Sequence, residues 1–126
     1  MPYINKPIRK KPNTKLNRLN FNNKYNKFYQ HSREVRNEYF NTHQLCELSL
    51  VEGKYVPAEH VHHLYEITRG HTDEERDYIA SLYENLISLS KDMHYNVHNH
   101  PNRLTDKQKL YLAHRLDIVH KILNIK

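Results

Sequence analysis

The chain has 126 residues, which is enough for one small domain, and its 37% hydrophobic content with three Phe and no Trp allows only a modest core. It carries 20 basic and 14 acidic residues, and its single cysteine, Cys46, excludes an internal disulfide framework and a zinc site built mainly on thiolates. No stretch is long and apolar enough for a membrane span or a signal peptide, so we expect a cytoplasmic protein without a membrane partner.

The first part of the chain is strongly basic. Residues 1–33 hold nine Lys or Arg and no acidic residue, whereas residues 34–126 hold eleven basic and fourteen acidic residues. Residues 1–26 are also rich in Asn and hold three of the five prolines, which predicts a flexible arm. Lys and Arg displace counterions from a nucleic-acid backbone, so we expect the arm to contact DNA, and a solubilising tail is the alternative. The candidate DNA-binding residues are Lys6, Arg9, Lys10, Lys11, Lys15 and Arg18.

The first half of the chain is predicted to contain a helix, two turns and an extended segment. Apolar side chains at helical spacing predict a helix over residues 29–40. Residues 46–49 resemble a tight turn, and Gly53 marks a second turn. Apolar and polar side chains alternate over residues 54–64, which predicts one arm of a hairpin.

The second half is predicted to contain capped helices and a second strand. Thr72 with Glu75 three residues later has the pattern of a capping box that opens a helix. Residues 86–89 form the second strand, and Ser90 caps a helix over residues 91–98.

The last predicted helix begins at a second capping box, formed by Thr105 and Gln108, and runs towards Asn124. We expect it to bury apolar side chains that recur about every third residue. These are Leu110, Ala113, Leu116, Val119 and Leu123.

Histidines are concentrated in the middle of the chain, where residues 60–100 hold seven of the eleven. His62 and His63 end the predicted strand, so one imidazole could face a metal and the other a water molecule. His94 and His98 are four residues apart on a predicted helix and share one face, which lets both bind one cation. Three neutral imidazoles would leave coordination positions open for water and a phosphate oxygen.

Simpler interpretations stay open for some of these residues. A histidine pair on a helix is commonly only a polar feature of the surface. His60, His71 and His100 fit no role in this geometry, and we interpret them as surface or DNA-proximal residues. Cys46 has no nucleophile signature around it and is interpreted as a turn or core cysteine.

Five segments in order carry a resemblance to a known family, over about three-fifths of the chain. They are Phe28–Arg36, Leu45–Gly53, Val56–His63, Glu84–Ser90 and Met93–His94. Together they resemble the His-Asn-His (HNH) endonucleases with the ββα-metal fold, especially small phage-type members. The resemblance implies an α+β fold with a small ββα-metal core and flanking helices. It divides the chain into a flexible basic arm over residues 1–26, an endonuclease domain over residues 27–104, and a C-terminal helix over residues 105–126 that packs on the domain.

The same resemblance implies roles for five residues. His63 would be the general base, and His62, His94 and His98 would bind one divalent metal cation. Asn85 would be the middle Asn, which either holds His63 through a hydrogen bond or braces the loop behind it. The products implied by the family carry 5′-phosphate and 3′-hydroxyl ends.

The chain departs from the family at a structural zinc site. Many relatives carry two Cys-x-x-Cys knuckles, and the corresponding places here hold Cys46 with Ser49 and Ser90 with Met93. One cysteine of four remains, so we expect no structural zinc and a domain held by packing and capping instead.

These residues predict a metal-dependent DNA endonuclease. His63, with an ordinary pKa near neutrality, would take a proton from the attacking water, and Asn85 would orient it. Histidine ligands favour transition metals, so the cation is expected to be Mg, Mn, Ni, Co or Zn, with Mn, Ni or Co at least as effective as Mg. One alternative is a non-catalytic DNA-binding or terminase-accessory protein that keeps the HNH fold, and another is a small metal-binding interaction module. The family also implies a link to phage genome packaging, with terminase subunits as partners beside DNA.

Overall fold

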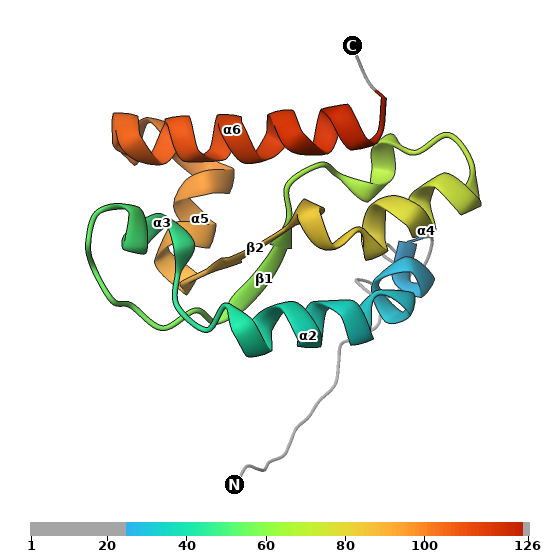
Figure 1. Cartoon of the computed structure of the whole chain (residues 1–126), viewed down its shortest axis with the longest axis horizontal. Helices are drawn as coiled ribbons and strands as arrows, with labels where there is room; N and C mark the ends of the chain where they lie inside the picture. The colour runs from blue at the N-terminus through green and yellow to red at the C-terminus, as the bar shows by residue number, and fades with distance from the viewer. Residues whose placement is uncertain (1–24, 125–126) are drawn as a thin grey trace, which may run out of the picture.

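The computed structural model of the protein describes residues 25–124. Helices flank one antiparallel pair of strands, so the predicted α+β class is confirmed (Figure 1). Residues 25–31 are helical and precede the labelled elements. In chain order these are α2 (Arg33–Thr42), α3 (Glu47–Val51), β1 (His60–His63), η1 (Ile67–Arg69), α4 (Asp73–Ser81), η2 (Tyr83–Asn85), β2 (Leu86–Leu89), α5 (Lys91–Asn99), η3 (Pro101–Arg103) and α6 (Asp106–Ile122).

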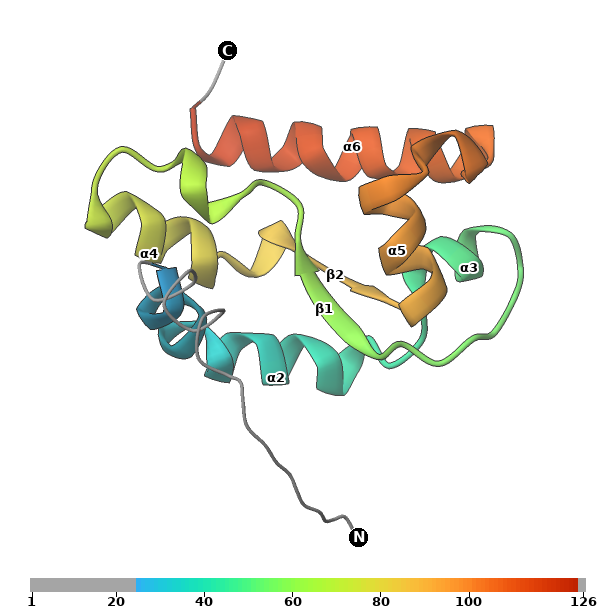
Figure 2. The same ribbon diagram turned by 180° about the vertical axis from the view of Figure 1, so that it is seen from behind.

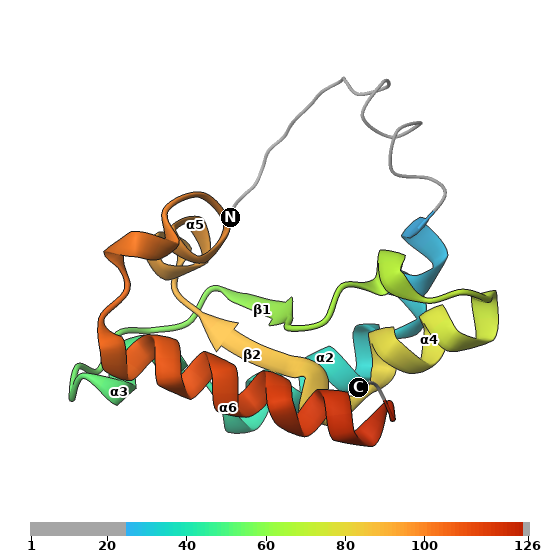
Figure 3. The same ribbon diagram turned by 90° about the horizontal axis from the view of Figure 1, so that it is seen from above.

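The two strands lie at the centre of the fold. β1 pairs with β2 in an antiparallel register that sets His62 opposite Ile87 and His63 opposite Leu86. All four residues of β2 are buried, as expected for a strand that is covered on both faces. Two strands alone are marginally stable in water, so the surrounding helices must stabilise the pair. In Figures 1 and 2 the strands run between α2 and α6, and Figure 3 shows α5 on the opposite side of the strands from α6.

Two clusters of buried apolar side chains join the elements. The first joins α3, β2 and the segment before α6, and it consists of Cys46, Leu48, Ile87, Leu89 and Leu104. Met93 and Val97 of α5 pack against it, which fixes α5 on β2. The second joins the helical residues 25–31 to η1 and α4, and it consists of Phe28, Ile67, Ile79 and Ala80. Each fully buried Leu or Ile stabilises the fold by about 1.5–3 kcal/mol relative to an exposed one.

The predicted caps of α5 and α6 are confirmed. The Ser90 hydroxyl accepts a hydrogen bond from the Met93 amide at 3.2 Å and begins α5 directly after β2. Thr105 and Gln108 form a complete reciprocal capping box at the start of α6. Such caps satisfy amides that have no partner inside the helix, so they fix where each helix begins.

The capping box predicted at α4 is only half formed. The Thr72 hydroxyl accepts from the Glu75 amide at 3.1 Å, as predicted. The Glu75 carboxylate instead accepts from the His71 amide at 2.8 Å, with the His71 ring nitrogen Nδ1 3.2 Å from the same oxygen. In a complete capping box the Glu75 carboxylate would accept one bond, from the Thr72 amide. Here it instead meets two polar groups of His71.

The tight turn predicted at residues 46–49 is wrong, because these residues lead into and form the short helix α3. Leu48 is fully buried in the first core cluster, and the Glu47 side chain is buried beside β2. Contacts with distant parts of the chain therefore stabilise a helix that the local sequence does not signal.

The extended arm predicted over residues 54–64 is confirmed only at its end, where β1 lies. Pro57 has no amide hydrogen to donate, and it forms a single bridge with Leu45 instead of a longer ladder. Gly53 lies in a turn, as predicted, with a φ of +77° that glycine adopts readily.

The face of α6 that packs on the domain differs from the predicted one. Leu110 is 70% exposed and Ala113 is exposed, whereas Val119 is buried and Leu116 and Leu123 are half-buried. Nine residues of helix turn through about 900°, so Leu110 and Val119 point in opposite directions. The observed contact face follows a spacing of three and four residues, through Gln108, Tyr111, Leu112, Arg115 and Val119. Two of its members are polar or charged, which a search for apolar residues does not detect.

One buried carboxylate ties α3 to three other elements. Glu47 accepts from the Ser88 amide at 2.8 Å, the Tyr111 hydroxyl at 2.5 Å and Arg115 Nη1 at 2.7 Å, and also from the Tyr39 hydroxyl. Burial, together with the bonds to Glu47, raises the pKa of both tyrosines, which therefore remain protonated donors. Four hydrogen bonds from α2, β2 and α6 thus converge on one side chain of α3.

Within residues 25–124, none of the helices combines the length and the apolar character needed to cross a membrane.

Candidate metal and catalytic site

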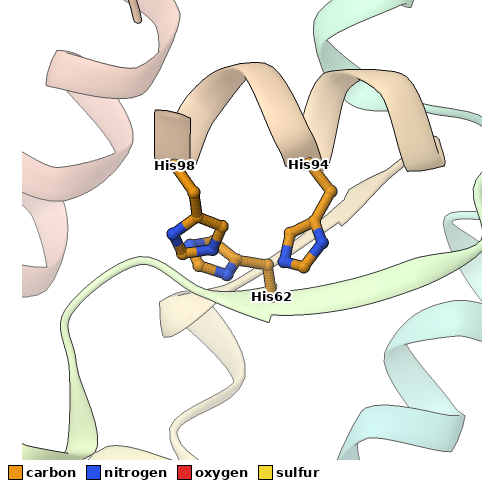
Figure 4. A group of neighbouring side chains, drawn as sticks. All are labelled: His62, His94 and His98. Atoms are coloured by element: carbon orange, nitrogen blue, oxygen red, sulfur yellow. The ribbon is translucent and has the colours of Figure 1, made fainter. Parts of the chain in front are cut away.

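Three histidines from two elements converge on one point (Figure 4). His62 projects from β1, and His94 and His98 project from one face of α5. The ring centroids of His62 lie 5.2 Å from His94 and 4.6 Å from His98, and those of His94 and His98 lie 4.7 Å apart. One ring nitrogen of each lies within 4.8 Å of the other two. The structure therefore brings the three predicted metal ligands together.

The short connection between β2 and α5 causes this convergence. Ser90 follows β2 directly and caps α5, so the helix begins against the sheet. Residues four apart on a helix stand one turn apart on the same face, which aligns His94 with His98. His62 lies opposite Ile87 in the strand pair, and Ile87 belongs to the core cluster on which α5 packs.

The donor set fits a transition-metal cation. A tetrahedral ion with bonds of 2.0–2.1 Å needs its nitrogen ligands about 3.4 Å apart, so the three rings would need to close by no more than about 1.5 Å. Three protein ligands leave at least one position open, as in catalytic sites. Among residues 25–124 the cluster contains no carboxylate, so it suits a hard cation such as Mg²⁺ less well.

Burial favours the neutral form of two members of this cluster, His62 and His94. Desolvation, followed by repulsion from His98, His94 and His63, lowers the pKa of His62 to about 3. Desolvation, followed by repulsion from His98 and His60, also lowers the pKa of His94. The neutral imidazole is the form that binds a cation, so these two ligands need to lose no proton on binding.

His63, the next residue of β1, has a different environment. It is 7% exposed, and its Nε2–H donates to the Ala80 carbonyl oxygen at 2.8 Å. Because a carbonyl oxygen can only accept, this bond places the proton on Nε2 and leaves the lone pair on Nδ1. The Tyr29 ring packs edge-on against the imidazole, with centroids 5.8 Å apart.

The predicted ordinary pKa of His63 is wrong. Burial lowers the pKa of this imidazole, and the hydrogen bond to Ala80, which opposes the shift, does not compensate. The nearby Arg36 guanidinium lowers the pKa further. His63 is therefore neutral at pH 7, with a free lone pair on Nδ1.

Asn85 braces the chain around His63 without bonding to it. It is fully buried, and its Oδ1 accepts from the Tyr65 amide at 2.7 Å. Its Nδ2 donates to the carbonyl oxygens of Tyr65 and Ile79, both at 3.0 Å. These bonds match the second of the two predicted arrangements, in which Asn85 braces the loop behind His63, and its part in catalysis stays a prediction. Asn85 also holds the residue before Ala80, which orients the His63 ring.

The histidines open on a shared cleft of about 1020 Å³. Its lining mixes cationic, aromatic and acidic side chains around the two histidine groups. Besides the histidines, these are Arg36, Arg69, Tyr29, Tyr65, Glu59 and Glu66. The cleft thus brings His63 and the three-histidine cluster to one solvent-accessible space.

His60 and Arg36 are among the cleft residues that received no role from the sequence. The His60 ring lies 4.8 Å from that of His94, and the available signal was its spacing of two from His62, which places both on one face of a strand. Arg36 reaches the cleft because α2 packs across β1, which no local pattern shows. The six candidate DNA-binding residues, Lys6, Arg9, Lys10, Lys11, Lys15 and Arg18, lie outside the described residues, so their role stays a prediction.

Cys46, Ser49, Ser90 and Met93, which the family resemblance sets at the places of the zinc knuckles, also lie close together. Burial raises the pKa of the Cys46 thiol, but hydrogen bonds with Ser49 and Ser90 outweigh this effect and lower it. Met93 packs against the same cluster. The set offers one thiol, whereas a structural zinc site uses four sulfur or nitrogen ligands. The absence of a structural zinc stays a prediction.

Comparison of the chain with protein-family models, with curated protein sequences and with solved structures finds no match in any of the three.

Proposed function

We propose that the protein is a metal-dependent DNA endonuclease of the HNH type, with β1, β2 and α5 as its ββα-metal core. One observation carries the proposal: a three-histidine cluster and a separate buried histidine, supplied by neighbouring residues of one strand, open on the same cleft. Neighbouring strand residues point to opposite faces, so the metal ligand His62 and the base His63 do not compete for one role.

In this proposal His63 is the general base. Its Nδ1 takes a proton from water while the water oxygen bonds to phosphorus, and the bond from phosphorus to the 3′ oxygen breaks. The leaving 3′ oxygen takes a proton from solvent, which gives 5′-phosphate and 3′-hydroxyl ends. The bond from Nε2 to Ala80 keeps the ring in the tautomer that this step needs. The lowered pKa keeps the basic form populated at neutral pH.

A divalent cation held by His62, His94 and His98 would supply Lewis-acid stabilisation of charge on the nonbridging and 3′ oxygens. Asn85 acts as a positioning residue, because its three hydrogen bonds hold the loop after His63 and the segment before Ala80. These groups lie on strands and helix ends rather than on long loops, which favours a preorganised site.

The proposed substrate is DNA. The cleft contains the cationic side chains Arg36 and Arg69, but residues 25–124 hold twelve basic and fourteen acidic residues in total. General attraction to a polyanion must therefore come mainly from residues 1–24, which hold seven basic residues and no acidic one.

A plasmid-nicking assay tests this proposal. Supercoiled DNA should be nicked or linearised with Mn²⁺, Ni²⁺ or Mg²⁺ and left intact with EDTA. His63→Ala should lower the rate by about 100-fold or more while the metal affinity stays near the wild-type value, because His63 is not a ligand. His71→Ala is the matched control, since His71 is exposed and lies outside the cleft.

Three results would contradict the proposal in different ways. Salt-dependent DNA binding without metal-dependent cleavage would indicate a non-catalytic DNA-binding protein. Metal binding without DNA affinity would indicate a metal-binding interaction module. Loss of metal affinity in His63→Ala would mean that the roles of His62 and His63 must be exchanged.

A further inference from the structure

A guanidinium without an acidic partner lies beside His63. Arg36 of α2 lines the cleft with His63. Its Nε–H donates to the Ser32 hydroxyl at 3.1 Å, and its Nη2–H donates to the Tyr29 carbonyl oxygen at 2.6 Å. Both acceptors are neutral, and among residues 25–124 no ion pair involves Arg36. Both Nη1–H groups likewise have no partner in the described part of the chain.

The acidic residues of the same cleft are bonded to other groups. The Glu59 carboxylate accepts from the Lys91 amide at 3.4 Å. Glu66 pairs with Arg69 at 3.6 Å. Among the described residues, neither of these carboxylates forms an ion pair with Arg36.

We propose that Arg36 binds a nonbridging oxygen of the phosphate that is cleaved and holds that phosphate against His63. This inference rests on the proposed nuclease function and names the group that recognises the phosphate. Two hydrogen bonds fix the plane of the guanidinium in advance, so little side-chain entropy is lost on binding. The free Nη1 edge provides the donors that a phosphate oxygen accepts.

The placement also suits the transition state. Negative charge increases on the nonbridging oxygens while the attacking water loses its proton to His63. A guanidinium that is fixed and partly desolvated stabilises that charge more strongly than a hydrated one. Removal of one such donor typically lowers kcat by about 100- to 1000-fold.

A structural alternative must be separated from this role. Arg36 caps the carbonyl of Tyr29 and contacts Ser32, so its loss could only loosen the junction between residues 25–31 and α2. Arg36→Lys keeps the positive charge but loses the planar set of guanidinium donors. Arg36→Gln keeps a hydrogen-bond donor without the charge. Arg33→Ala is the matched control, because it removes an arginine from the same helix at a position that does not line the cleft.

The experiment uses the full chain loaded with Mn²⁺ and two substrates, a duplex oligonucleotide and bis(p-nitrophenyl) phosphate. The second is a small diester without neighbouring phosphates. Arg36→Ala should lower the maximal rate on both by about 100-fold. Arg36→Lys should retain more activity than Arg36→Gln, because charge matters more than the neutral donor. Arg33→Ala should match the wild type on the small diester. Mn²⁺ affinity, measured by calorimetry, should be the same for all variants.

Each other outcome has one meaning. A wild-type rate of Arg36→Ala on the small diester, with weaker binding of the duplex, would place Arg36 on a distant phosphate and overturn the inference. If Arg36→Lys and Arg36→Gln cleave at equal rates and lose equal amounts of melting temperature, Arg36 has a structural role. That result would also overturn the inference. In both cases the nuclease function stands. Failure of the wild type to cleave either substrate with any metal would overturn the function and the inference together.

Discussion

Replacing Arg115 by Met removes the cation that pairs with the buried Glu47 carboxylate. The two side chains are 16% and 7% exposed, and Nη1 of Arg115 lies 2.7 Å from Oε1 of Glu47. Met keeps much of the length and apolar stem but cannot donate a hydrogen bond. Glu47 would keep three donors, from Tyr39, Ser88 and Tyr111. The Arg115→Met variant therefore removes the positive charge from a carboxylate that is still hydrogen-bonded, together with the bonds from Arg115 Nη2 to the carbonyl oxygens of Leu86 and Glu84.

Removing one partner of a buried pair commonly costs about 3–5 kcal/mol of unfolding free energy. Because three donors to Glu47 remain, we expect Arg115→Met to lower the unfolding free energy by about 3 kcal/mol, near the lower end of this range. Glu47→Gln should cost a similar amount, because it leaves the guanidinium without its counter-charge. In the double variant no unpaired charge remains, so its cost should fall below the sum of the two single costs by at least about 1 kcal/mol.

The assay is urea denaturation at pH 7 and 25 °C, followed by the helical circular dichroism signal. EDTA is present throughout, because a bound metal would add its own stabilisation. Lys121→Met is the matched control, since it breaks an exposed pair with Asp117 on the same helix, where side-chain exposures are 78% and 59%. That control should change stability by less than about 0.5 kcal/mol. A cost below about 1 kcal/mol for Arg115→Met, or strictly additive single costs, would refute the reasoning.

Four further outcomes can be measured independently. His94→Ala and His98→Ala should each weaken Mn²⁺ affinity at least about tenfold in calorimetry, and an unchanged value for His98→Ala would show that water takes its place. Because the folded-state pKa of His62 lies below the unfolded value of 6.5, stability without metal is full above pH 6.5. The contribution of His62 should fall by roughly 1.4 kcal/mol per pH unit as pH drops from 6.5 towards 3, so His62→Gln should make the total slope shallower by about that amount. The fold should keep a cooperative melt after exhaustive chelation, and a collapse that zinc alone reverses would contradict this. Deletion of residues 1–24 should weaken binding to unrelated DNA sequences alike and flatten the dependence on salt, with identical salt slopes as the contrary result.

The elements that were predictable from the sequence are those fixed by local signals. β2 and the start of α5 follow from an apolar run and from Ser90, whose capping bond spans three residues. The start of α6 follows from Thr105 and Gln108 in the same way. α3 was missed because its burial depends on hydrogen bonds to Glu47 from residues up to 68 positions away. No pattern within the segment itself could reveal those partners.

In the candidate site, too, the features set by local sequence were predictable and those set by long-range contacts were not. The spacing of His94 and His98 follows from helix geometry alone. Their approach to His62 depends on the register of β1 and on the packing of α5, which the sequence indicated only through the family resemblance. The acceptor of His63 is the carbonyl of Ala80, seventeen residues away, and a carbonyl group belongs to every residue type. The lowered pKa of His63 was missed for the same reason, since burial depends on the whole fold.

In the proposed function, the register of β1 on β2 separates the role of His62 from that of His63, and Asn85 helps to fix that register. A slip of one residue would exchange the environments of His62 and His63, because the side-chain period of a strand is two. Such a slip would break the two hydrogen bonds that Asn85 makes to Tyr65, which follows β1 closely in the chain. Each contributes a net of about 0.5–1.5 kcal/mol, and a buried amide left without partners costs more than that net value. Asn85 therefore helps to hold the proposed metal ligand and the proposed base in separate environments, although none of its three hydrogen bonds goes to either imidazole.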